Sequence, residues 1–360
     1  TDAMYDRKYA DLEKRQNDKY DALGRPSKQY ASYPVAGNGI YQSGASTAAV
    51  NYYNNSSNFC LNNNRGYLLN EYEPGDGERI KKQYQPGSDK AVEFTYGGNA
   101  TGEVKRYTVS GTGVLNPDNY GAGQLSWVQT KDENGNRTRE YKDKSGRIIL
   151  RRTYLSDDNS NNLDTYYVYD DFSQLRFVLQ PKYQDNASLD LYAFKYRYNA
   201  KGLISSKSIP AGGTTSMIYD ERDRLKETTD GRGKTVYMKY DNLNRMTESG
   251  EKVGAVETTL SRLHYDNYSP AFGGNEAFTA AGGNYPSSFR SNVKGKQTVL
   301  ATKVLNPDST YGSWLYATVY YDERFNPIQT IRTLYDIGGT AKELQSNLLR
   351  YDGRIEQELT

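Results

Sequence analysis

The sequence predicts an all-β protein built from short antiparallel hairpins, and three observations lead to this fold class. Tyrosine, which favours strands, fills 35 of the 360 positions, while 33 glycines supply residues for turns. Hydrophobic residues make up only 36% of the chain, below the roughly 45–50% of ordinary globular domains, which disfavours a helical bundle or a doubly wound α/β enzyme. Finally, a motif that opens with tyrosine recurs, with Tyr198, Tyr219 and Tyr240 spaced 21 residues apart.

Each copy of this motif is predicted to be the turn of a β-hairpin. The copies read YDALGRP, YDDFSQL, YNAKGLI, YDERDRL, YDNLNRM and YDERFNP. The aspartate after the tyrosine can accept hydrogen bonds from backbone amides ahead of it, and a glycine, asparagine or aspartate near the end of the loop tolerates positive φ. A short loop of this kind joins two paired strands. The predicted turn residues are Tyr20, Asp21, Gly24, Tyr169, Asp170, Tyr198, Gly202, Tyr219, Asp220, Asp223, Tyr240, Asp241, Asn244, Tyr321, Asp322 and Asn326.

The flanking residues alternate as strands do. Aromatic and cationic side chains take turns over 194–198, and apolar side chains recur at every second position over 236–240. Successive hairpins are therefore expected to pair edge to edge into one long, curled or spiral antiparallel sheet.

Several stretches break the repeat and suggest how the chain is organised. Residues 1–155 are predicted to form an irregular β-rich N-terminal region, and residues 156–360 a region of hairpins, separated by the polar run SDDNSNN. A long surface loop or irregular segment is expected over 31–66, and a Gly-rich loop near 267–297. Residues 3–16 show helical spacing, which indicates either one short helix or an effect of where the sequence starts.

The amino-acid composition argues against several kinds of site and partner. A single cysteine, Cys60, and a single histidine, His264, allow no intramolecular disulfide and no Cys/His zinc site. The net charge of +2 gives no reason to expect nucleic acid as a partner, and no stretch is apolar enough for a transmembrane helix. The DENGN run at 132–136 has its glycine at the wrong position for a calcium loop and is predicted to be a hairpin turn. We nominate no catalytic, cofactor-binding or metal-binding residue.

The Y-D-x-x-G-R-L pattern, repeated about every 20 residues, resembles the YD repeat of Rhs proteins. Longer segments extend the likeness. Residues 93–110, 129–154 and 166–181 follow in the order found in Rhs-type proteins of Bacteroidetes, and 302–331 and 334–355 resemble later parts of such proteins. The resemblance covers most of residues 20–355. It implies that the hairpins wind into a β-spiral that closes as a hollow shell, which in many family members encloses a C-terminal toxin.

The resemblance also implies a function. We expect a structural, non-enzymatic segment of a larger polypeptide that is exported to the cell surface or beyond, with the type IX secretion translocon as a transient partner. No D-P-x-G-R core signature, autoproteolysis site or toxin domain is recognised, so a toxin or other cargo is expected outside this segment, as is the signal peptide. The alternative is a carbohydrate- or protein-binding module that uses Tyr and Trp side chains such as Trp127 and Trp314. A polysaccharide-degrading enzyme is a third, less favoured class.

Overall fold

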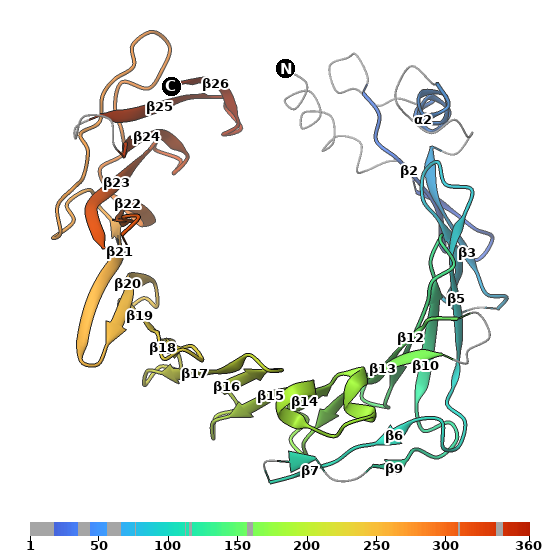
Figure 1. Ribbon diagram of the computed structural model, residues 1–360. Helices are drawn as coiled ribbons and strands as arrows, with labels where there is room; N and C mark the ends of the chain where they lie inside the picture. Colours follow the sequence, from blue (N-terminus) through green and yellow to red (C-terminus); the bar gives the residue numbers. More distant parts are fainter. Residues whose placement is uncertain are drawn as a thin grey trace. The chain divides into compact units, whose positions relative to one another are not determined.

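A computed structural model of the protein describes residues 18–34, 44–55, 66–75, 77–111, 113–114, 117–156, 161–308, 310–335 and 341–360. The chain divides into two compact units, Thr1–Lys195 and Tyr196–Thr360, called here the N-terminal and C-terminal units. Most described elements are antiparallel strands joined by tight turns (Figure 1), which confirms the all-β prediction. The division after Lys195 falls later in the chain than the predicted boundary between residues 155 and 156, which stays a prediction.

The N-terminal unit is a single antiparallel sheet in which strands follow chain order, apart from one long connection between β5 and β10. That connection, residues 99–125, carries two short strand pairs, β6 with β9 and β7 with β8. The sheet strands are β1 (Asp18–Tyr20), β2 (Pro26–Tyr30), β3 (Tyr67–Tyr72), β4 (Ile80–Tyr84), β5 (Ala91–Gly98), β10 (Ser126–Lys131), β11 (Arg137–Lys142), β12 (Ile148–Tyr154), β13 (Asn162–Tyr169), β14 (Leu175–Leu179) and β15 (Ala193–Tyr198). The remaining elements are α2 (Ala45–Tyr53), β6 (Lys105–Arg106), β7 (Val109–Ser110), β8 (Gly113–Val114), β9 (Asp118–Asn119), the 3-10 helix η2 (Pro181–Gln184) and α3 (Leu189–Tyr192).

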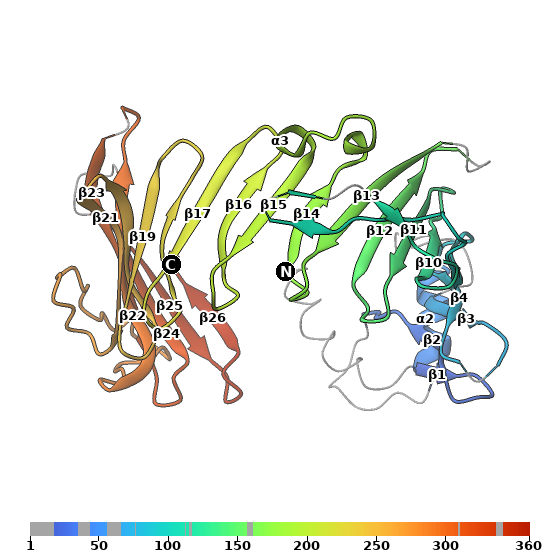
Figure 2. The same cartoon turned by 90° about the horizontal axis from the view of Figure 1, so that it is seen from below.

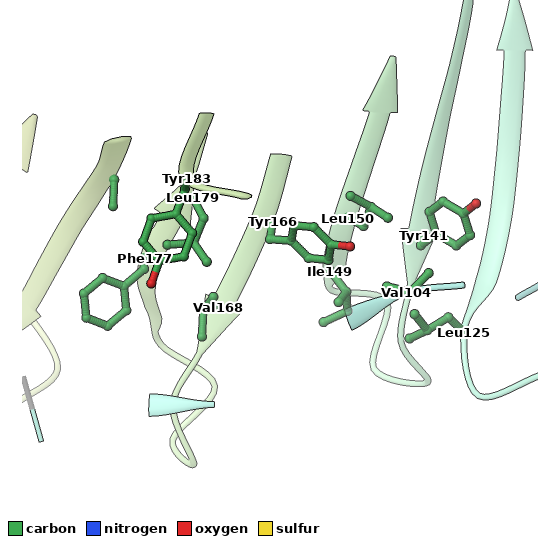
Figure 3. Close-up of a cluster of buried hydrophobic side chains, with 11 residues drawn as sticks. Val104, Leu125, Tyr141, Ile149, Leu150, Tyr166, Val168, Phe177, Leu179 and Tyr183 are labelled. Atoms are coloured by element: carbon green, nitrogen blue, oxygen red, sulfur yellow. The ribbon is translucent and has the colours of Figure 1, made fainter. Parts of the chain in front are cut away.

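Strand alternation places the core of this unit on one face of the sheet. Cross-strand pairing aligns five buried residues in one row, because their registers match from strand to strand: Tyr141, Leu150, Tyr166, Leu179 and Ala193. Figure 3 shows most of this cluster together with Val104 and Leu125, which the 99–125 connection contributes. The connection therefore covers the apolar face of the sheet.

The expected irregular stretch over 31–66 contains a helix. Helix α2 buries Ala49, and the chain passes so close to it at Gly66 that a Cβ atom there would lie 2.9 Å from the Ala49 carbonyl oxygen. The small side chains of ASTAA make a short helix possible although the stretch has little periodicity. Cys60 and the possible helix at 3–16 lie outside the described residues.

The C-terminal unit is an antiparallel sheet in which neighbouring strands are consecutive in the chain. Figure 2 shows its hairpin turns along two opposite rims of the sheet. Its strands are β16 (Ile204–Ile209), β17 (Gly213–Tyr219), β18 (Leu225–Thr229), β19 (Thr235–Tyr240), β20 (Met246–Val253), β21 (Val256–Asp266), β22 (Val293–Leu305), β23 (Tyr311–Tyr321), β24 (Pro327–Thr333), β25 (Lys342–Leu349) and β26 (Ile355–Leu359).

The Gly-rich loop comprises residues 267–292, and the last residues of the predicted range, 293–297, belong to β22. Its rings pack on the sheet: Tyr268 stacks on Tyr320 with centroids 4.6 Å apart, and Phe289 meets the same ring at 4.6 Å. Gln329 fixes the loop backbone by accepting from the Thr279 N–H at 3.0 Å and donating to the Thr279 carbonyl at 2.6 Å. The loop thus forms a second, smaller core with Ile328 and Ile331.

Candidate functional site

The recurring feature of both units is the turn that follows a motif tyrosine. In the turn 220–224, Asp220 Oδ1 accepts hydrogen bonds from the backbone N–H groups of Arg222 (2.9 Å) and Arg224 (3.0 Å), while Asp220 Oδ2 accepts from Arg224 Nε at 2.7 Å. These bonds, with the Arg224 N–H contributing most, hold the pKa of Asp220 below its ordinary value. The same set of bonds is made by Asp21 and by Asp241.

The other predicted aspartates and the asparagine of YNAKGLI act in the same way. Asp170 Oδ1 accepts from the N–H groups two and four residues ahead, as do Asp322 and Asn199. Positive φ occurs at Gly24 (77°), Gly202 (80°), Asp223 (62°) and Asn244 (65°).

One expected position needs correction. In the turn after Tyr321, the positive φ falls on Phe325 (63°) and not on Asn326. In these turns the residue with positive φ is the fourth after the tyrosine. Phe325 holds that position, as Gly24 and Gly202 do, whereas Asn326 is one residue further along. Ser173, four residues after Tyr169, has φ of 62° and was not singled out.

The motif tyrosines hold neighbouring hairpins together. Tyr219 donates its phenolic O–H to the carbonyl of Ile204 at 2.9 Å, and Tyr240 donates to the carbonyl of Leu225 at the same distance. Each acceptor is the first residue of the returning strand in the preceding hairpin. Tyr321 makes the corresponding bond to Gln297 at 2.7 Å. Equivalent bonds join Tyr72 to Pro26, Tyr96 to Ile80 and Tyr265 to Met246.

In several of these turns, an arginine four residues after the turn aspartate reaches forward to the next turn. Arg224 Nη1 donates to the carbonyl of Asp241 at 2.8 Å, and its guanidinium lies 4.8 Å from the centre of the Tyr240 ring. Arg245 forms a bidentate pair with Asp266 (2.8 and 2.7 Å) and lies 4.4 Å from the Tyr265 ring.

The N-terminal unit repeats this arrangement. There Arg25 lies 4.4 Å from the Tyr72 ring and donates to the carbonyls of Gly75 and Gly77, while Arg147 lies 5.0 Å from the Tyr169 ring and donates to Ser173 Oγ. We call this unit of contacts a turn junction: the aspartate and arginine of one turn with the tyrosine of the next.

Comparison with known proteins agrees with this repeat. The family described as RHS Repeat matches residues 198–235, which include two motif tyrosines, and a second family, described as Domain of unknown function (DUF6443), matches residues 10–99. The chain contains an Rhs/YD repeat.

More distant similarities accompany these matches. Salivary gland surface protein 1 of Aedes aegypti is 27% identical over 165 residues, which is 41% of this chain and 5% of that protein. A crystal structure of TcdB2-TccC3 matches 95% of this chain with 13% identity and a TM-score of 0.47, and the Photorhabdus luminescens Tc holotoxin pore matches 87% with 11% identity and a TM-score of 0.34. The chain spans 17% and 21% of those two solved chains.

The arginine of the junction is the functional residue that sequence reasoning missed in this Rhs/YD-repeat chain. The motif contains an arginine directly after the residue with positive φ in YDALGRP, YDERDRL and YDNLNRM. The four-residue spacing between aspartate and arginine could have predicted this role, because the turn brings the carboxylate and the guanidinium together. What it could not show is the contact with the next turn, which lies 16 or more residues further along the chain.

Other residues considered from the sequence lie in structural settings. Trp127 is half-buried with the Arg139 guanidinium 4.0 Å from its ring, and Trp314 has Arg262 at 5.1 Å, so a cation covers part of each indole. His264 lies in β21, and Asp132 forms the β10–β11 turn by accepting from the backbone N–H groups of Asn134 and Asn136.

No group of three or more His, Cys, Asp or Glu side chains among the described residues is arranged to hold a metal ion. Within the same part of the chain, no helix has the length and hydropathy needed to cross a bilayer.

Proposed function

We propose that this chain is a structural wall segment of a shell built from YD hairpins, and that it has no catalytic role. The repeated turn junction is the observation that supports this most strongly. Each junction uses an aspartate, a guanidinium and a tyrosine ring, all of which every complete repeat supplies. Hairpins can therefore be added one after another with the same contacts, as a continuous wall requires.

The hairpins of 204–253 support a wall rather than a self-contained globular domain. Within this range only Tyr237 and Gly250 are buried, so the repeats do not enclose an apolar core of their own. Pairing along the sheet and the junctions at its rim supply the contacts instead. A wall also removes exposed strand edges, which otherwise promote aggregation.

We further propose that the wall belongs to a larger exported polypeptide that encloses or presents a C-terminal cargo, of the type found in Bacteroidetes. The resemblance of the long segments between 93 and 181 to Rhs-type proteins supports this step. Type IX secretion is the proposed export route. Its translocon should co-purify with the native protein, and repeated absence of the translocon would count against that route.

The test of the wall uses the full-length polypeptide from its source. Electron microscopy should show closed particles, and limited proteolysis should leave any enclosed sequence intact. The double variant Arg224→Ala, Arg245→Ala should admit protease, whereas Arg232→Ala, in an exposed turn on the opposite rim, should not. Open particles with an equally cleaved interior in the wild-type protein would overturn the proposal.

The alternative binding-module function makes a different prediction. It requires saturable binding of a glycan or protein that is lost on replacing Trp127 or Trp314 by alanine.

A further inference from the structure

One junction in the C-terminal unit differs from the others and borders a cavity of about 450 Å³. The cavity lies between the Gly-rich loop at 286–290, the turn 322–326 and the chain at 348–351. Its volume falls within the roughly 300–1,000 Å³ of ligand-binding clefts. Because all three segments belong to one unit, the cavity is a feature of that unit alone.

Asparagine stands beside this cavity at the position of the junction arginine. Asn326 stands four residues after Asp322, where Arg25, Arg224 and Arg245 stand in complete junctions. Its Nδ2 still donates to Asp322 Oδ2 at 3.1 Å, so it keeps the contact within its own turn. The guanidinium that lies against the following turn comes instead from Arg324, which is 4.2 Å from the centre of the Tyr351 ring.

Three arginines surround this space, and they are not balanced by the acids beside them. The Asp322 carboxylate is hydrogen-bonded within its own turn, where it accepts from two backbone N–H groups and from the Asn326 side chain. Glu323 pairs with Arg290 at 3.2 Å. Arg324 stacks on Tyr351 at 4.2 Å and donates to its carbonyl.

That leaves two cations without a carboxylate partner. Within the described part of the chain, no carboxylate forms an ion pair with Arg324, and the exposed Arg350 side chain makes no hydrogen bond or ion pair. The remaining lining is mostly apolar and includes Phe289, Leu349 and the buried Ile328. Cations beside an apolar wall are the complement of an apolar group flanked by carboxylates.

We propose that this cavity is a docking site for an acidic segment of a partner protein that carries one apolar anchor residue. The anchor side chain lies against Phe289, Ile328 and Leu349, and carboxylates next to it pair with Arg324 and Arg350. The proposal goes beyond the wall function and does not depend on it, because the site is formed by residues 286–351 alone.

A peptide titration tests the site. The probe is a fluorescein-labelled pentapeptide with a central phenylalanine flanked by two aspartates and two glutamates, and the control peptide has asparagine and glutamine in their place. Fluorescence anisotropy with this chain should show saturable binding of the acidic peptide that weakens as salt is raised. Absence of saturable binding, or equal binding of the neutral peptide, would overturn the proposal.

Two variants with matched controls sharpen the result. Arg350→Glu should weaken binding roughly tenfold or more, since it reverses the charge of an exposed, unpaired side chain, while Arg232→Glu in an exposed turn on the other rim should not. Asn326→Arg adds positive charge yet should also weaken binding, because its guanidinium fills the cavity. If Arg350→Glu binds as the wild type does, or if Asn326→Arg binds more tightly, no acidic segment docks in this cavity.

Discussion

The N-terminal core and the bare hairpins of 204–253 hold an antiparallel sheet in two different ways. In the first, a row of five buried side chains runs across β11 to β15, and the 99–125 connection covers it. In the second, only Tyr237 and Gly250 are buried, and the turns are linked by Arg224 and Arg245. The comparison shows that YD hairpins can form a sheet without an apolar cover. An apolar core is added where an insertion folds over the sheet.

The largest effect is expected from a deletion in the covered core. Leu150 is fully buried in the row that spans the strands, so Leu150→Ala should lower the free energy of unfolding by about 2–5 kcal/mol. Val236→Ala, on an exposed position of the bare hairpins, should change it by less than about 1 kcal/mol. Urea denaturation measures both, and equal losses at the two sites would remove the distinction between the regions.

Loss of a junction arginine should have the next largest effect. Arg245→Ala removes a bidentate pair with Asp266, the bond to Asp241 and the contact with Tyr265. Since hydrogen bonds to charged groups contribute about 1.5–3 kcal/mol, a loss of that order is expected. Arg245→Lys should recover only part of it, because lysine lacks the bidentate fork. Arg232→Ala is the control, and a loss as large in that variant would show that the junctions are not special.

Backbone strain in a turn should lower the free energy of unfolding somewhat less than the loss of a junction arginine does. Gly202 has φ of 80°, a backbone conformation that residues with a Cβ atom rarely adopt. Gly202→Val should therefore destabilise the turn through its backbone conformation, by about 1–2 kcal/mol, whereas Gly202→Asn should be milder because asparagine tolerates positive φ. An unchanged melting temperature for the valine variant would contradict the turn assignment.

A single junction hydrogen bond should contribute least among the substitutions. Tyr219→Phe removes the donor to the Ile204 carbonyl and keeps the ring, so we expect a loss of about 0.5–1.5 kcal/mol. Tyr335→Phe, at an exposed ring, serves as the comparison. Thermal unfolding of the two variants should separate them, and identical melting temperatures would mean that the bond adds nothing.

Acid should weaken the junctions gradually. The Arg245 guanidinium holds the pKa of Asp266 well below its ordinary value, and the N–H of Arg224 lowers the pKa of Asp220. Carboxylates with lowered pKa stabilise the fold above their unfolded pKa, near pH 4, and lose that contribution as the pH falls further. The melting temperature should thus fall below about pH 4, and less steeply in Asp266→Asn. A slope unchanged by that substitution would exclude Asp266 as a contributor.

Much of the fold could be predicted from the sequence, because its determinants are local. Tyrosine-rich alternation specifies strands, and an aspartate followed by a residue that tolerates positive φ specifies the turn between them. The Asx bonds of Asp220 and Asp241 span only four residues, so the motif contains all their partners. Helix α2 was not predicted, because its short segment of small residues lies in a stretch where apolar residues do not recur at helical spacing.

The contacts between turns could be settled only by the tertiary structure. Arg224 and Tyr240 are adjacent because strand pairing brings successive motif turns to one rim, and Leu150 is buried because a connection 25 or more residues upstream folds over it. The cavity beside Asn326 likewise depends on the Gly-rich loop, which packs against the turn from a distance in sequence. Sequence by itself determined what each hairpin is, since hairpin geometry follows from near neighbours. Tertiary structure decided what each hairpin touches, since those contacts depend on register and on which insertions cover the sheet.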